Sequence, residues 1–275
     1  MARDVVVAGW GQITQPKHQK DGLLDPLGLM ARAAVRAGER ARVPLGKLDA
    51  VLVVRPMSAS YTDAAGELAT KLGATPRTAE VSRIGGNSPQ TLVNRAAGMI
   101  ARREADTVLV VGAETYYRRD HATPDRDTVL FQGVPDGYDS DDLIGTTDLE
   151  ARHGMVAPIH GFPLLETAQW ARTDRSIDDH LRDIGTTWAR FSEVAARHPN
   201  AWIRRARTAD EFITPCAVNR QIAFPYRKYL NSLVAVDMGA AVLLTATPAA
   251  RAGQRPVYFR GGGYAEDRQR FIVQR

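Results

Sequence analysis

A short turn with the sequence IGGNSPQ, at residues 84–90, has residue types that could do chemistry. Its two glycines, Gly85 and Gly86, permit a sharp turn with unusual backbone angles. Ser88 followed by proline is typical of a cap and first helical turn, which predicts a helix beginning at Ser88. Because the N–H groups and dipole at the amino end of a helix favour negative charge, this end could stabilise an anion or an activated nucleophile. Asn87 and Ser88 are the candidate polar side chains.

Ser88 could itself be a nucleophile, since GNSPQ partly matches the Gly-x-Ser-x-Gly elbow of α/β-hydrolases. That elbow needs a second glycine where this chain has Gln90. It also needs a histidine late in the chain, after the acid, whereas the last histidine, His198, falls in a predicted insertion. The sequence therefore favours Ser88 as a helix cap.

Two further motifs are weaker. GWGQ at residues 9–12 follows a predicted strand, as a dinucleotide-binding turn does, but the third glycine is missing and no helix begins before Pro26. We predict a tight turn there. An acidic stretch lacks the glycine and glutamate positions of a calcium loop, so we predict a solvated loop. Its aspartates are Asp136, Asp139, Asp141 and Asp142.

Composition indicates a globular protein. Of the 275 residues, 44% are hydrophobic and 24% are charged, a balance that excludes a disordered chain. No run approaches the ~20 apolar residues of a membrane helix, so we expect no membrane span. The N-terminus has Asp4 and glycines within a short apolar run, unlike a secretory signal, and we expect a cytoplasmic protein.

The net charge and the cysteine count limit the classes of partner and the kinds of site that the chain can have. Lys and Arg number 36 against 31 Asp and Glu, a net charge of +5. No basic stripe interleaved with aromatic residues is present, so nucleic acid is not an expected partner, while a nucleotide phosphate is compatible with this charge. The single cysteine, Cys216, excludes disulfides within the chain and cysteine-cluster metal sites, and no metal is expected. The densest basic stretch holds Arg204, Arg205 and Arg207.

Alternating strand and helix patterns in the first half predict an α/β layer structure with a largely parallel sheet and helices on it. Asp25 before Pro26 predicts the start of one helix, and residues 63–72 predict another that stops at Gly73. The expected strands are residues 4–8, 50–54, 78–81, 107–111 and 256–262, and residues 235–245 are expected to form a buried strand or a strand–helix element.

The middle of the chain has a different composition and a different hydrophobic pattern. Residues 120–148 are rich in Asp and Gly, which predicts extended loops, and apolar side chains at helical spacing from Ile177 to Ala195 predict a helix that Pro199 ends. The expected division is a core of residues 1–115 and 230–275 and a largely helical inserted loop domain of residues 116–229.

Several motifs follow one another in a recognisable order. The glycine turn and its apolar helix precede ADTVLVVGAE at residues 105–114; HPNAW at 198–202, IAFP at 222–225 and VDMGAA at 236–241 follow. This order resembles the thiolase superfamily, in the sterol-carrier-thiolase branch of thiolase-like proteins often labelled acetyl-CoA acetyltransferase. The resemblance covers nearly the whole chain. It implies a thiolase-like α/β fold with a mixed or parallel sheet, covering helices and an inserted loop domain.

The resemblance also implies a missing thiol. The nucleophilic cysteine of the family falls on Gly85, or with a small register shift on Gly86 or Asn87, and none of these carries sulfur. A thiolate splits acyl exchange into two easier covalent steps. We expect Cys216, in the predicted insertion, to be a buried structural residue. The base histidine and second cysteine of the family lie in a second half, and we expect this chain to end near the start of that half.

Further site residues follow from the resemblance. In the family, coenzyme A lies against the insertion and reaches the turn, and residues 155–160 resemble the segment that roofs the pocket. His160 would approach a thioester oxygen, and Asn87 would donate a hydrogen bond where the nucleophile otherwise sits. A coenzyme A thioester is the expected ligand, with no cofactor bound covalently. Its phosphates would contact Arg204, Arg205 or Arg207.

Two hypotheses for function remain. The first is an enzyme or subunit that handles acyl-CoA in lipid or steroid metabolism, an acyltransferase or carbon–carbon lyase that needs a partner or missing residues. The second is a non-catalytic acyl-CoA or lipid carrier, or an assembly scaffold. We expect a homo- or hetero-oligomer, because the helix after the turn is apolar around most of its circumference and exposed large side chains are costly. A partner surface is expected to cover Leu92, Met99 or Ile100.

Overall fold

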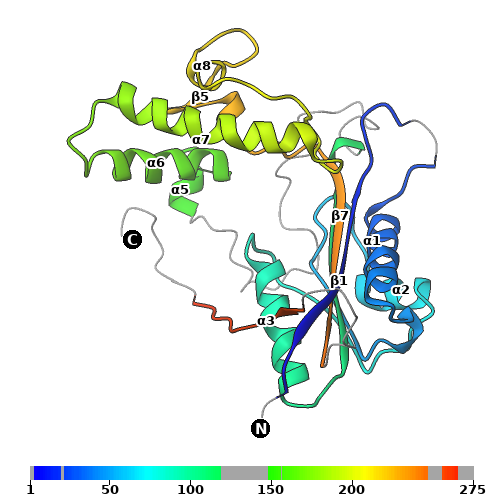
Figure 1. Ribbon diagram of the computed structural model, residues 1–275. Helices are drawn as coiled ribbons and strands as arrows, with labels where there is room; N and C mark the ends of the chain where they lie inside the picture. The colour runs from blue at the N-terminus through cyan, green and yellow to red at the C-terminus, as the bar shows by residue number, and fades with distance from the viewer. Residues whose placement is uncertain (1–2, 20–21, 119–147, 156, 247–255, 266–275) are drawn as a thin grey trace. The chain divides into compact units, whose positions relative to one another are not determined.

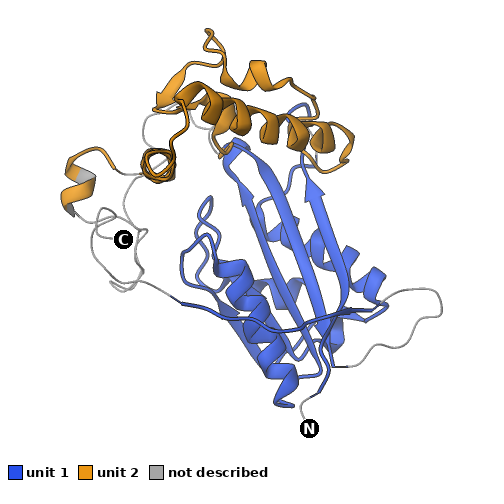
Figure 2. Ribbon diagram, turned by 60° about the vertical axis from the view of Figure 1, so that its left-hand side comes forward, with its two compact units in different colours: residues 1–143, 235–266 blue, residues 144–234, 267–275 orange. Residues whose placement is uncertain are grey.

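The computed structural model describes residues 3–19, 22–118, 148–155, 157–246 and 256–265 (Figure 1). The chain divides into two compact units, drawn in blue and orange in Figure 2. Unit 1 comprises Met1–Leu143 and Ala235–Glu266, and unit 2 comprises Ile144–Val234 and Asp267–Arg275. The assignment of residues 116–229 to an inserted loop domain stays a prediction. The acidic loop with Asp136, Asp139, Asp141 and Asp142 lies outside the described residues.

The described strands of unit 1 form one mixed sheet. They are β1 Val6–Thr14, β2 Ala50–Val53, β3 Thr78–Val81, β4 Thr107–Thr115, β7 Asp237–Thr245 and β8 Val257–Tyr258. Their order is β3-β2-β4-β7-β1-β8. β2 runs parallel to β3 and β4, whereas β7 is antiparallel to β4 and β1, and β8 is antiparallel to β1. The α/β class and mixed sheet are confirmed, and the parallel arrangement holds only for β3, β2 and β4.

Helices cover both faces of this sheet. One face carries α1 (Pro26–Ala41) and α2 (Ala64–Lys71), and the other carries α3 (Ser88–Ala101) (Figure 1). Local signals set the helix ends, as predicted. The Asp25 carboxylate accepts the Gly28 N–H at 2.8 Å where α1 begins. Gly73, just after α2, has φ of +66°, which favours glycine.

Two glycines lie in the middle of β1, which corrects the tight turn expected at residues 9–12. A Cβ atom at Gly9 would lie 2.1 Å from the carbonyl oxygen of Ala37, and one at Gly11 would lie 2.0 Å from that of Ala33. Both carbonyls belong to α1. The glycines therefore let the backbone of the helix approach the strand closely, a contact that the local sequence does not reveal.

The apolar side of α3 is covered by its own sheet. Leu92 is 5% exposed, Met99 is 6% exposed and Ile100 is fully buried, in a core shared with strand residues such as Leu52 and Val108. The expectation that a partner surface covers these three side chains is wrong. The reason is geometric, because the helix turns them toward β2 and β4 and leaves residues such as Arg95 on its outer side.

Unit 2 is largely helical in its described part. A long helix contacts a short one: Gly185 of α7 lies so near α8 that a Cβ would be 2.8 Å from the carbonyl oxygen of Ala209. Asn219 is fully buried, and its amide donates to the carbonyl oxygens of Glu211 and Phe212, both at 3.0 Å. The elements are α5 Asp148–Arg152, α6 Pro158–Trp170, α7 Ile177–Arg197, α8 Ala209–Ile213, β5 Gln221–Ala223 and β6 Tyr226–Arg227. No helix in the described ranges has both the length and the apolar character to cross a membrane.

Candidate functional site

The candidate turn lies at the amino end of α3, where β3 has just ended. Because β2, β3 and β4 are parallel, the loops that follow them leave the same edge of the sheet. The loop after β2 holds the turn in place: the backbone N–H of Arg55 donates to the Ser82 hydroxyl at 3.1 Å, and its Nε donates to the Ser82 carbonyl at 3.2 Å. Ser82, just before the turn, is thus held by the loop after β2.

Ser88 has a structural role, and the prediction that it caps α3 is wrong. Asn87 occupies the cap position without a side-chain cap hydrogen bond, and Ser88 is the first helical residue. The Ser88 hydroxyl donates to the carbonyl oxygen of Arg83 at 2.8 Å, and the residue is only 7% exposed. This bond closes the turn across five residues and holds the hydroxyl inside it. Ser88 therefore stabilises the turn, and a role of its hydroxyl toward a ligand stays a prediction.

Gly85, Gly86 and Asn87 are exposed, and the turn does not require glycine. Neither glycine has a positive φ, which corrects the unusual backbone angles expected there. A Cβ at Gly86 would meet nothing within 4 Å. A Cβ at Gly85 would lie 2.8 Å from the Asn87 Oδ1 atom, the movable end of a side chain, and 3.3 Å from the Ser88 hydroxyl. The backbone would accept a cysteine at either position.

A carboxylate at the end of β4 supports the same edge of the sheet. Glu114 accepts the backbone N–H groups of Met57 and Ser58, each at 2.8 Å. The Ser58 hydroxyl in turn accepts the N–H of Thr115 at 2.8 Å. This network joins the loop after β2 to β4. Sequence analysis missed the role of Glu114, although an acid at the end of an apolar strand is a usable signal.

A second acid, Asp237 at the start of β7, is fully buried. It accepts the N–H of Arg118 at 3.2 Å and lies 3.6 Å from the guanidinium of the same residue. Its carbonyl oxygen accepts the N–H of Gln15 at 3.0 Å. Asp237 thus joins the ends of β1, β4 and β7, which explains why an acid can begin this otherwise apolar strand.

His160 lies in the first turn of α6, in unit 2. Its ring Nδ1 is buried and has no hydrogen-bond partner among the described residues. A buried ring nitrogen without a partner is costly, so it is a candidate contact for a ligand group. Asn87 and Ser88 belong to unit 1, and a joint role of these residues with His160 stays a prediction.

The three arginines expected at phosphates have different environments within unit 2. Arg205 forms an ion pair with Glu211 at 3.1 Å. Arg207 places its guanidinium 4.3 Å from the ring centre of Tyr229. Arg204 is exposed and makes no ion pair with another described residue. Arg204 therefore retains the most freedom to meet an anion, while the other two are partly engaged.

Cys216 is exposed, so its expected burial is wrong. It lies in a tight turn after α8, where its backbone exchanges hydrogen bonds with Asn219. Asn219 is the residue of this turn whose side chain points inward. Because one member of the turn already fills the interior, the thiol remains at the surface.

Sequence analysis also missed a cluster of three titratable side chains in unit 2. Glu166 accepts a hydrogen bond from the Tyr226 hydroxyl at 2.5 Å and pairs with His180 Nε2 at 2.7 Å. Burial, and then the bond to the Glu166 carboxylate, raises the pKa of the Tyr226 phenol above its usual range. The cluster joins α6, α7 and β6. Glu166 and Tyr226 are 60 positions apart, so no spacing pattern could reveal it.

Across the described ranges no group of three or more His, Cys, Asp and Glu side chains could hold a metal ion. What the structure offers at α3 is a helix amino end, two exposed glycines and the Asn87 amide. Such an end can orient and polarise an anionic or carbonyl group, but it supplies no nucleophile.

The mixed sheet, with α3 on one face and α1 and α2 on the other, is a thiolase-like superfamily fold. A monomeric SCP2-thiolase-like protein type 1 from Mycobacterium smegmatis is 28% identical, with a TM-score of 0.69 over 90% of this chain and 46% of that one. An Ltp2-ChsH2(DUF35) aldolase is 20% identical, with a TM-score of 0.64 over 89% of this chain and 56% of that one.

A third similar structure is an acetyl-CoA acetyltransferase from Syntrophomonas wolfei, 15% identical, with a TM-score of 0.57 over 90% of this chain and 65% of that one. The chain therefore spans between 46% and 65% of the length of these three proteins. No family model and no curated protein matches the sequence.

Proposed function

We propose that the chain binds an acyl-CoA thioester of lipid or steroid metabolism and forms no covalent thioester of its own at α3. The supporting observation is the exposed turn at the amino end of α3, which keeps a thiolase-like setting but presents Gly85, Gly86 and Asn87 without sulfur. The backbone would accept a cysteine at Gly86, and at Gly85 after a shift of the Asn87 side chain, so the missing thiol is a property of the side chains and not of the fold.

In this proposal Asn87 and the N–H groups at the start of α3 polarise the thioester carbonyl. Donors fixed near a developing negative charge stabilise it without reorganisation. Ser88 and Glu114 hold the turn and its neighbouring loop in position. The Nδ1 atom of His160, which has no hydrogen-bond partner among the described residues, contacts the thioester oxygen in this proposal. Arg204, the least engaged of the three arginines, contacts a phosphate.

Catalysis by this chain would need groups that it does not itself offer at the turn. We propose that an acyltransferase or carbon–carbon lyase activity is completed by a partner subunit or by a second thiolase-like half. The aldolase with a similar fold contains a DUF35 component, which supports a hetero-oligomer. The alternative function is a non-catalytic acyl-CoA or lipid carrier or scaffold. The absence of a nucleophile from Gly85, Gly86 and Asn87 favours that alternative.

Calorimetric titration with acetyl-CoA, a long-chain acyl-CoA and free CoA tests binding. We expect Asn87→Ala and His160→Ala each to weaken acyl-CoA affinity by about tenfold, the effect of losing one well-placed hydrogen bond. His153→Ala is the matched control, because His153 is an exposed histidine of the same unit. Unchanged affinity in both site variants would remove both residues from the proposal.

Exchange of label between acetyl-CoA and free CoA separates the two functions. Binding without exchange supports the carrier, whereas exchange that survives alkylation of Cys216 supports an enzyme without a covalent thiol intermediate. Exchange that alkylation abolishes would contradict the proposal, since Cys216 is the single thiol in the chain.

A further inference from the structure

The outer side of α1 carries an open groove, on the face of the sheet opposite α3. One part of the groove encloses about 540 Å³ and an adjoining part about 300 Å³. The two parts share Val35, Glu39 and Leu45, so they form one continuous surface. The floor is apolar, formed by Ile13, Leu24, Val35, Val43, Leu45 and Leu72.

Val35, the floor residue that belongs to α1, is unusual for the outer side of a surface helix. Val35 is 44% exposed, although it lies mid-helix beside the partly buried Leu45 and Leu72. Outer positions of a helix that covers a sheet normally carry polar side chains. Water in contact with these side chains would be released by an occupant, which favours binding.

The rim of the groove is cationic. It carries Arg32, Arg36, Arg42 and Lys71, against Glu39 as the one acid among the described lining residues. Arg36 donates to the carbonyl oxygen of Gln12 at 2.5 Å. The other three cations form no ion pair within the described part of the chain. Their charges therefore remain available to an acidic partner.

We propose that this groove docks an acidic amphipathic helix of a partner protein, with apolar side chains on the floor and carboxylates at the rim. Arg32 and Arg42 are ten positions apart on and just after α1, a span of about 15 Å at 1.5 Å per residue. A single phosphate or carboxylate cannot bridge that distance, whereas a helix with several acids can. This mode lays an apolar helical face into a groove.

Charge and shape argue against the other occupants. Two copies of the same face would bring the four cations of one rim against the four of the other, which disfavours a symmetric dimer through this groove. An anionic membrane is flat and would meet the rim but not the concave floor. The proposal does not depend on acyl-CoA binding, because α1 and α3 lie on opposite faces of the sheet (Figure 1).

The probe is a fluorescein-labelled peptide of 18 residues, with leucine at helical spacing and glutamate and glutamine elsewhere, followed by fluorescence anisotropy. We expect the wild-type chain to bind it, and 0.5 M salt to weaken the binding, because the rim contacts are electrostatic. We expect the double variant Arg32→Glu and Lys71→Glu to bind at least about tenfold more weakly. Val35→Asp should lose binding as well, because it places a charge on the apolar floor.

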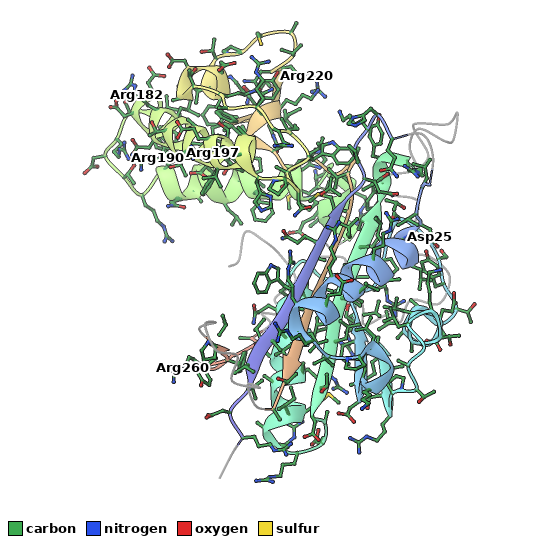
Figure 3. All side chains as sticks on the ribbon, turned by 45° about the vertical axis from the view of Figure 1, so that its right-hand side comes forward. Asp25, Arg182, Arg190, Arg197, Arg220 and Arg260 are labelled. Atoms are coloured by element: carbon green, nitrogen blue, oxygen red, sulfur yellow. The ribbon has the colours of Figure 1, made fainter. Side chains whose placement is uncertain are left out.

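The double variant Arg190→Glu and Arg197→Glu is the matched control, with the same number of charge reversals on α7 of unit 2, and it should leave binding unchanged (Figure 3). A second control is the same peptide with lysine in place of glutamate, which should not bind. Equal affinity of wild type and both groove variants would overturn the proposal, once circular dichroism shows that the variants fold. Binding to phosphatidylglycerol vesicles that the double variant abolishes, without peptide binding, would overturn it in favour of a membrane surface.

Discussion

The close approach of α1 to β1 predicts a large effect for Gly9→Ala. The new Cβ would lie 2.1 Å from the carbonyl oxygen of Ala37, and 2.8 Å and 2.9 Å from the backbone nitrogen and Cβ of Ala41. Non-bonded contact needs about 3.5 Å. The obstacle is helix backbone and not the end of a flexible side chain, so α1 must withdraw from the sheet by roughly 1 Å or more.

The loss in unfolding free energy follows from the side chains that α1 buries. Leu29 and Met30 are fully buried against the sheet. A gap of ~1 Å removes about a quarter to a half of the dispersion energy of such contacts, or about 1 kcal/mol or more for each large side chain. With the alanines of the same face added, we expect unfolding free energy to fall by about 3 kcal/mol, the upper part of the range for overpacked sites.

Urea denaturation followed by far-UV circular dichroism measures this change, and a thermal scan should show a midpoint lower by about 6–12 °C. Gly86→Ala is the control, since a Cβ there meets nothing within 4 Å and the residue has no positive φ. The control should stay within about 1 kcal/mol of wild type. A Gly9→Ala protein as stable as Gly86→Ala would refute the contact between strand and helix.

Three further predictions concern the site, the second core and pH. In the Gly85→Cys variant, the new thiol should take an acetyl group from acetyl-CoA, with CoA leaving as the thiolate. Mass spectrometry should show that this cysteine is acetylated faster than Cys216 is in the wild type, because the amino end of α3 favours a thiolate. Equal rates would count against an acyl group reaching this turn. Ile100→Ala should cost about 2–5 kcal/mol in urea unfolding, because the side chain is fully buried, and a loss under about 1 kcal/mol would contradict its place in the core. Burial and a carboxylate partner raise the pKa of the Tyr61 and Tyr226 phenols in the folded state. The resulting stabilisation is fully present below about pH 10, the pKa of an unperturbed tyrosine, and should be lost as the pH rises further. Tyr226→Phe should therefore flatten the fall in stability at alkaline pH, and an unchanged profile would contradict this assignment.

The sequence predicted those features of the fold whose causes are local. The cap at Asp25 and the stop at Gly73 act within one helical turn, so the start of α1 and the end of α2 were predictable. Gly9 and Gly11 show the opposite case. They resemble a turn in sequence, yet they serve a helix that lies about 25 residues further along the chain, and only the folded backbone reveals that contact.

The candidate site shows the same limit. The turn before α3 was identified correctly, because glycines before a Ser-Pro pair are a local signal. The contacts that support the neighbouring loop were not identified, since the residues that donate to Glu114 lie 56 and 57 positions away from it in the sequence. Cys216 was wrongly expected to be buried, because single buried cysteines are common and nothing nearby in sequence shows that Asn219 fills the interior instead.

The geometry of the turn bears on why it lacks a thiol. If Gly85 and Gly86 were needed for a left-handed backbone or for close packing, their lack of side chains would have a structural explanation. Neither has a positive φ, Gly86 has free space around its Cβ position, and the nearest obstacle at Gly85 is the movable Asn87 amide. The glycines are therefore unnecessary for the fold. Ser88 nevertheless closes this turn through its hydrogen bond to Arg83, and Glu114 holds the neighbouring loop after β2, so the position of the turn is set by contacts that do not involve the two glycines.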